Sequence, residues 1–97
     1  MKTKTFWNVW TQDLPASLSK KEAIEQIKNH WGLSYGPTYR RLRGGMFPNF
    51  VKDISFMYQN FGIGFNMDRG FFFDHQQFEL INEKEELENA RIFNLSK

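Results

Sequence analysis

Alternating positions at the start of the chain predict a β-strand. Between Thr5 and Trp10, the side chains of Thr5, Trp7 and Val9 would lie on one side of an extended backbone. The segment 13–17, Asp-Leu-Pro-Ala-Ser, then favours a turn, because proline lacks an amide donor and Asp and Ser favour turns. We therefore expect a first strand over residues 5–10.

The next segment has the sequence signals of an amphipathic helix. Ser19 and Glu22 match a capping box, in which the serine hydroxyl accepts a hydrogen bond from the Glu22 amide. Apolar residues then recur at helical spacing, at Ala23, Ile24, Ile27 and Trp31. Gly32 follows as the residue type that most often ends a helix in the left-handed conformation. A helix is predicted over 19–31.

A second, shorter helix is predicted after Ser34. Pro37 is tolerated in the first turn of a helix, and the glycine pair at 44–45 would end it. Such a helix would bury Tyr39 and Leu42, which are three residues apart and so lie on one face.

Beyond Pro48 the pattern alternates again and predicts strands. One strand would carry Ile54, Phe56 and Tyr58 on one face, and a turn at Gln59-Asn60 would lead into the next, over 61–67. A turn at 67–70 then precedes a third strand, Phe71–Phe73, buried on both faces. Gly62 and Gly64 would leave one strand face smooth, where we expect an aromatic ring or helix of the same chain to pack.

The last segment predicts a short terminal helix. Asn82 and Glu85 match a second capping box, and Leu87 and Ala90 continue the helical spacing. Residues 91–95 fit either a helix or a strand. The predicted fold is therefore one α+β domain spanning residues 1–97, in which one amphipathic helix and a second short helix pack on a mainly antiparallel sheet of three to five strands.

Charge is distributed unevenly along the chain. The formal net charge is +2, yet residues 1–45 hold eight Lys and Arg against three acids, whereas residues 46–97 hold five against eight. The chain has no cysteine, no apolar stretch that would make its start a signal peptide, and no apolar run near the ~20 residues that a membrane span needs. We expect a soluble, cytoplasmic protein without a membrane partner.

The segment 35–43 is the strongest candidate for a binding site. It combines Tyr35 with three guanidinium groups, those of Arg40, Arg41 and Arg43. Guanidinium groups hold phosphates through paired hydrogen bonds, so this segment favours contact with nucleic acid or phosphates. Three lysines of the preceding helix would assist, namely Lys20, Lys21 and Lys28.

The order of these elements resembles a helix-turn-helix module. Between Ala23 and Arg43 a helix, the turn Trp31-Gly32-Leu33-Ser34 and an arginine-bearing helix follow one another, and a hairpin comes later. Lys28 departs from the module, in which its position is usually small and apolar. The resemblance implies that the second helix enters the major groove of DNA.

Catalysis is not expected. His30 and His75 are the only histidines, and Asp74 and His75, as neighbours on a strand, would point to opposite faces. Gly62 and Gly64 lack the third glycine of a dinucleotide-binding motif. The sequence therefore predicts no metal site and no cofactor.

The alternative function is that of a protein-binding inhibitor, of the immunity or anti-defence type, which blocks a larger partner enzyme. Aromatic residues and arginine are favoured at the centres of protein interfaces. The acidic segment Glu79–Glu88 would fill the nucleic-acid groove of such a partner. The sequence gives a slight preference to nucleic acid over a larger protein.

Overall fold

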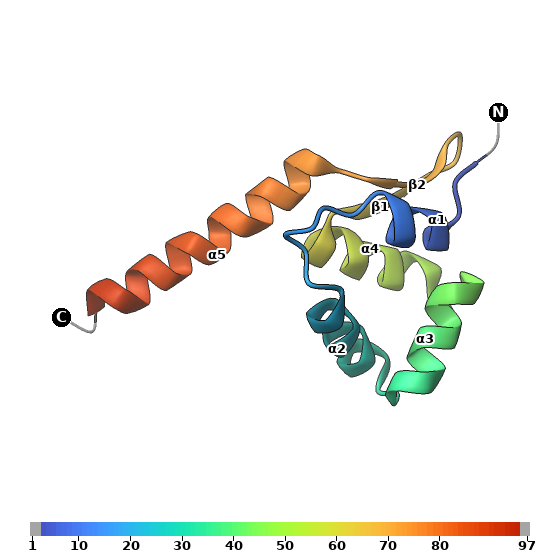
Figure 1. Ribbon diagram of the computed structural model, residues 1–97, viewed down its shortest axis with the longest axis horizontal. Helices are drawn as coiled ribbons and strands as arrows, with labels where there is room; N and C mark the ends of the chain where they lie inside the picture. The colour runs from blue at the N-terminus through green and yellow to red at the C-terminus, as the bar shows by residue number, and fades with distance from the viewer. Residues whose placement is uncertain (1–2, 96–97) are drawn as a thin grey trace.

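The computed structural model describes the backbone of residues 3–95 and the side chains of residues 3–87. These residues form five helices and one two-stranded antiparallel sheet (Figure 1). In chain order the elements are α1 (Phe6–Gln12), α2 (Lys20–Trp31), α3 (Tyr35–Gly44), α4 (Phe50–Phe61), β1 (Ile63–Asn66), β2 (Gly70–Phe73) and α5 (His75–Leu95).

The predicted fold class is wrong in its balance of helix and strand. In the described part of the chain, the sheet has two strands rather than three to five, and most residues are helical. The only addition to the sheet there is an isolated parallel bridge between Lys4 and Gly70. The fold is therefore mixed α/β and mostly helical.

The first predicted strand, over residues 5–10, is helix α1. The Thr5 hydroxyl caps this helix by accepting a hydrogen bond from the Asn8 amide at 3.1 Å. The buried residues are Phe6, Val9 and Trp10, a spacing of three and four that matches one face of a helix. Burying these three large side chains together requires a helix, and this packing decides the structure of the segment although its sequence alternates like a strand.

The predicted strand carrying Ile54, Phe56 and Tyr58 is also wrong, because these residues lie within α4. This helix buries Asp53, Met57 and Phe61, each four residues from the next. The predicted turn at Gln59-Asn60 falls inside the same helix.

The sequence located the remaining elements more closely. The Ser19 hydroxyl accepts from the Glu22 amide at 3.3 Å, and α2 ends at Gly32, which is left-handed with φ 67°. Helix α3 ends as predicted at the glycine pair. The hairpin pairs Ile63 with Phe73 and Asn66 with Gly70.

A single aromatic and aliphatic core joins α1, α2, α3, α4 and the hairpin. Phe6 lies at its centre and contacts Phe47 and Phe71 edge to face, with ring centroids 5.1 and 5.5 Å apart. The predicted close approach at Gly64 is confirmed, because a Cβ there would lie 2.6 Å from the Phe72 ring. The prediction that Gly62 shares this strand face is wrong, because Gly62 is the left-handed C-cap of α4 and β1 begins at Ile63. The strand Phe71–Phe73, predicted to be buried on both faces, is only half-buried.

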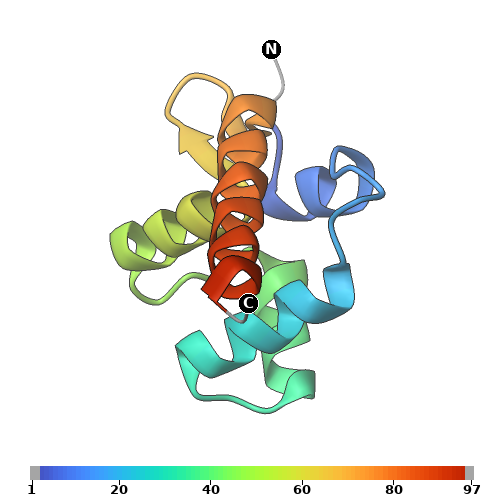
Figure 2. The same ribbon diagram turned by 90° about the vertical axis from the view of Figure 1, so that its left-hand side faces the viewer.

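Helix α5 projects away from the other elements (Figure 1), and in Figure 2 it lies in front of them. Its base is fixed where Phe78 is buried and where Gly62 approaches the Asp74 carbonyl. The predicted capping box at Asn82 lies inside α5, which begins earlier, and residues 91–95 are helical. None of the described helices combines the length and apolar character that crossing a membrane requires.

Candidate nucleic-acid interface

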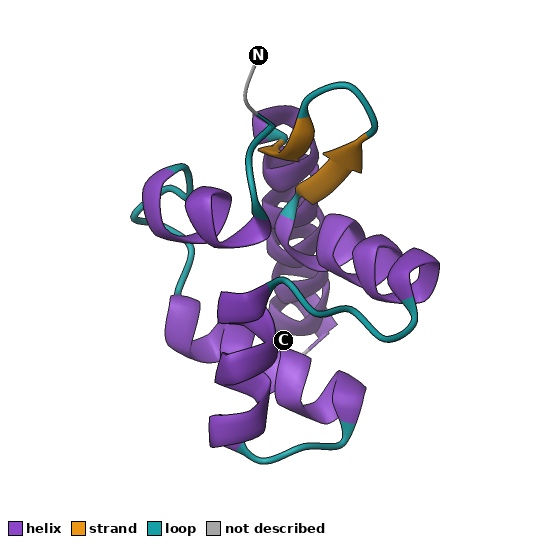
Figure 3. Ribbon diagram, turned by 90° about the vertical axis from the view of Figure 1, so that its right-hand side faces the viewer, coloured by secondary structure: helices purple, strands orange, loops and turns teal. Residues whose placement is uncertain are grey.

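Helices α2 and α3 form a two-helix unit joined by a short turn. Only Gly32, Leu33 and Ser34 separate them, and Gly32 provides the left-handed backbone that reverses the chain. In Figure 1 the two helices form a V that meets at this turn, and Figure 3 shows the turn as the loop at the bottom of the molecule. A connection of three or four residues, often with glycine, is typical of helix-turn-helix units.

Helix α3 has one buried face and one solvent-facing face. Thr38 and Leu42 are fully buried, whereas Arg40 and Arg43 are exposed. Arg40 and Arg43 are three residues apart, so their side chains emerge as neighbours from the same side. Gly36, one turn before Arg40, adds no side chain to this stripe.

Arg41 differs from the other two arginines. It lies about 100° around the helix from Arg40 and is half-buried, with its guanidinium carbon 5.2 Å from the centre of the Trp31 ring. This cation–π contact links α3 to the end of α2. Among the side chains that the structure describes, no carboxylate forms an ion pair with Arg40, Arg41 or Arg43.

The three lysines predicted to assist do not gather beside these arginines. Lys20 and Lys21 are exposed at the first turn of α2, about 16 Å along the helix axis from its junction with α3. Lys28 is half-buried and pairs with Glu25 at 3.1 Å. The structure therefore brings only Arg40 and Arg43 together on one open surface.

Tyr35 begins α3 and is 53% exposed. Its ring stacks on that of Tyr39 with centroids 6.0 Å apart, and Tyr39 in turn packs edge to face on Trp7 at 5.4 Å. This row of rings fixes the first two turns of α3 against α1.

A buried contact between α2 and α4 holds the unit in place. His30 Nε2 lies 2.9 Å from Asp53 Oδ1, and the His30 ring stacks on Phe56 at 4.1 Å. The other Asp53 oxygen accepts from the Asn49 amide at 3.2 Å. The sequence contains no signal for this pair, because its two residues are 23 positions apart.

The base of α5 carries a second polar contact, which is only partly buried. The Tyr58 hydroxyl donates to Asp74 at 2.7 Å, and Asp74 also accepts from the Gln77 amide and so caps α5. Donation from Tyr58 lowers the pKa of the Asp74 carboxyl, and the same hydrogen bond raises the pKa of Tyr58. The prediction that Asp74 and His75 are neighbours on a strand is wrong, because β2 ends at Phe73.

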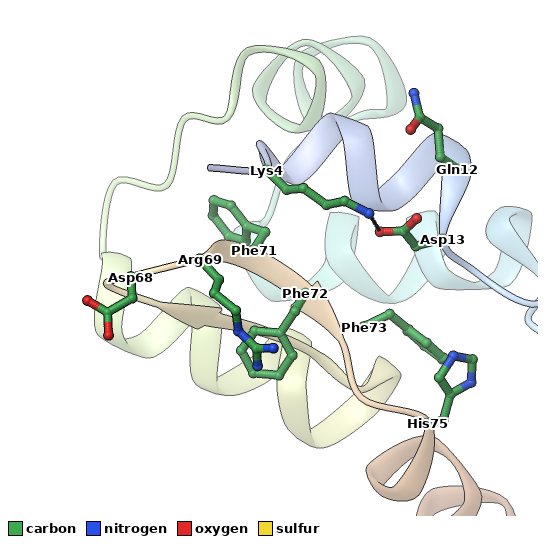
Figure 4. Close-up of a pocket in the computed structure, with 9 residues that line it drawn as sticks. All are labelled: Lys4, Gln12, Asp13, Asp68, Arg69, Phe71, Phe72, Phe73 and His75. Atoms are coloured by element: carbon green, nitrogen blue, oxygen red, sulfur yellow. Dashed lines mark hydrogen bonds and ion pairs between the residues drawn. The ribbon is translucent and has the colours of Figure 1, made fainter. Parts of the chain in front are cut away.

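A groove of about 600 Å³ lies between α1 and β2 (Figure 4). Lys4 crosses it to reach Asp13 at 2.7 Å, and Arg69 lies over the Phe72 ring at 5.8 Å. Lys4 and Asp13 neutralise each other, and the other two formal charges of the lining, those of Asp68 and Arg69, are opposite in sign, so the groove favours no ligand charge. Comparison with family models, with curated proteins and with solved structures gives no match, so the geometry alone must indicate what this chain binds.

Proposed function

We propose that this chain is a non-catalytic, cytoplasmic DNA-binding module that places α3 against duplex DNA. The observation that carries the proposal is the joint exposure of Arg40 and Arg43 on the second helix of a pair joined by three residues. In helix-turn-helix modules this second helix enters the major groove.

The spacing of the two arginines suits a phosphate or a base edge. Side chains three residues apart on a helix have Cβ atoms roughly 5–6 Å apart, close enough for both to engage adjacent groups on DNA. A guanidinium can contact a phosphate or the O6 and N7 atoms of guanine with two hydrogen bonds. Gly36 lets the backbone of α3 approach, and the exposed Tyr35 lies beside it.

The other cations have lesser roles in this proposal. Arg41 supports the angle between the helices through Trp31 and is a positioning residue. Lys20 and Lys21 add charge at a distance, and Lys28 is already paired with Glu25. Most of the affinity then comes from phosphate neutralisation, which depends steeply on salt.

The test is fluorescence anisotropy of a labelled duplex of mixed sequence, titrated at several salt concentrations. We expect Arg40→Ala and Arg43→Ala each to lower the slope of log affinity against log salt by about 1. Arg69→Ala is the matched control, because Arg69 is also an exposed arginine but lies on the hairpin turn. Absent binding, salt-independent binding, or an equal effect of Arg69→Ala would contradict the proposal.

The alternative function, a protein-binding inhibitor, is favoured by one observation. Helix α5 presents Glu79, Glu83, Glu85 and Glu86 on exposed positions of an element that stands away from the body. A row of carboxylates of this kind imitates a nucleic-acid backbone in charge. Affinity purification with and without nuclease distinguishes the two functions, since a stoichiometric protein partner that survives nuclease supports the inhibitor and counts against DNA.

A further inference from the structure

A second groove, of about 630 Å³, opens beside the carboxyl end of α3. The start of α1, the end of α3 and the hairpin enclose it, and its lining includes Trp7, Arg43, Phe65, Met67 and Phe71. We call it the Met67 groove. Met67 is 87% exposed, so this groove combines a large apolar side chain that faces solvent with the cation of Arg43.

Helix α5 has an outer face that matches this groove in chemistry. Leu80 and Leu87 are 59% and 66% exposed and are seven residues apart, which places them on one side of the helix. Glu83 and Glu86, both exposed, lie along one flank of that side. Phe78, which points into the body, is on the opposite side of the helix.

The exposed part of α5 would gain stability from a partner surface. A helical segment without tertiary contacts is marginally stable in water, because packing of an apolar face supplies most helical stability in proteins. Like charges at i and i+4, such as Glu79 and Glu83, weaken the helix further. Pairing the outer faces of two α5 helices would bring glutamates together, so a cationic, apolar surface is the better complement.

The two surfaces cannot meet within one chain. Helix α5 leaves the body on the side opposite to α3, as both Figure 1 and Figure 2 show. We propose that the outer face of α5 from one copy of this chain docks into the Met67 groove of a second copy, with leucines on the apolar lining and glutamates beside Arg43.

Sedimentation equilibrium of the full chain, without nucleic acid, tests this proposal independently of DNA binding. We expect the mean mass to rise reversibly with protein concentration. Met67→Glu in the groove and Leu87→Lys on the helix are each expected to weaken self-association at least about tenfold, the effect of losing one well-buried apolar side chain. Val51→Glu is the matched control, because Val51 is 81% exposed but lies outside this groove.

Mixing the two variants gives the sharpest result. The Met67→Glu protein keeps an intact helix and the Leu87→Lys protein keeps an intact groove, so an equimolar mixture is expected to regain one interface and form a one-to-one complex. A chain that stays monomeric at every concentration would overturn the proposal. Association that Leu87→Lys abolishes but Met67→Glu leaves unchanged would also overturn it, because that result indicates pairing between α5 helices.

Discussion

The contact between His30 and Asp53 gives the clearest prediction about stability. Asp53 is 2% exposed, and its carboxylate serves both His30 Nε2 and the Asn49 amide. Asp53→Ala removes the acceptor and leaves two donors without it. Leaving buried polar groups unpaired costs about 1–3 kcal/mol each, so we expect a total loss of about 3 kcal/mol. This loss is a large part of the roughly 5–15 kcal/mol that stabilises a typical domain.

Urea denaturation followed by circular dichroism measures this loss in the free energy of unfolding. In a thermal melt, the Tm of the variant is expected to be lower by roughly 12 °C or more. Asp13→Ala is the matched control, because Asp13 pairs with Lys4 at a shorter distance, 2.7 Å, but in an exposed setting. An exposed pair of this kind contributes about 0–1 kcal/mol. If the two variants lose equal stability, burial is not what gives the Asp53 contact its strength, and the reasoning fails.

Two further variants test close packing and the base of α5. Gly64→Ala is expected to cost about 2 kcal/mol in urea denaturation, because its Cβ would meet the Phe72 ring, whereas Gly36→Ala on α3 is expected to stabilise the chain; equal effects would refute the packing argument. Because the pKa of Asp74 is lowered in the folded state, the stabilisation that its carboxylate contributes is fully present above about pH 4. This contribution is lost as the pH falls through the folded-state pKa of Asp74. Tyr58→Phe is expected to flatten this acid loss, and an unchanged pH profile of unfolding would refute the coupling.

Local signals predicted the elements that depend on local chemistry. The Ser19 cap, the Gly32 end of α2 and the turn at 67–70 are set by residues within a few positions of each other. Helix α4 could not be predicted in this way, because its buried face includes Asp53. A carboxylate at an inward position interrupts the apolar period, and the remaining residues then imitate the alternation of a strand.

The candidate interface was predictable only in part. The sequence placed Arg40, Arg41 and Arg43 on one helix, and their angular spacing separates Arg41 from the other two. The partner of Arg41, the Trp31 ring, is on a different helix and depends on how α2 and α3 cross. Contacts of this kind, and the pairing of His30 with Asp53, depend on tertiary packing that no local pattern encodes.

Because α3 and α5 lie on opposite sides of the molecule, their opposite charges give it an electric dipole moment. The guanidinium groups of α3, which form no ion pair with any described carboxylate, lie near one end, and exposed carboxylates such as Glu83 and Glu86 extend from the other (Figure 1). A polyanion attracts the first end and repels the second, and these opposed forces exert a torque on the diffusing protein. Near a polyanion, this torque rotates the protein so that the arginines of α3 face the polyanion. A larger share of encounters with a polyanion therefore begins in this orientation.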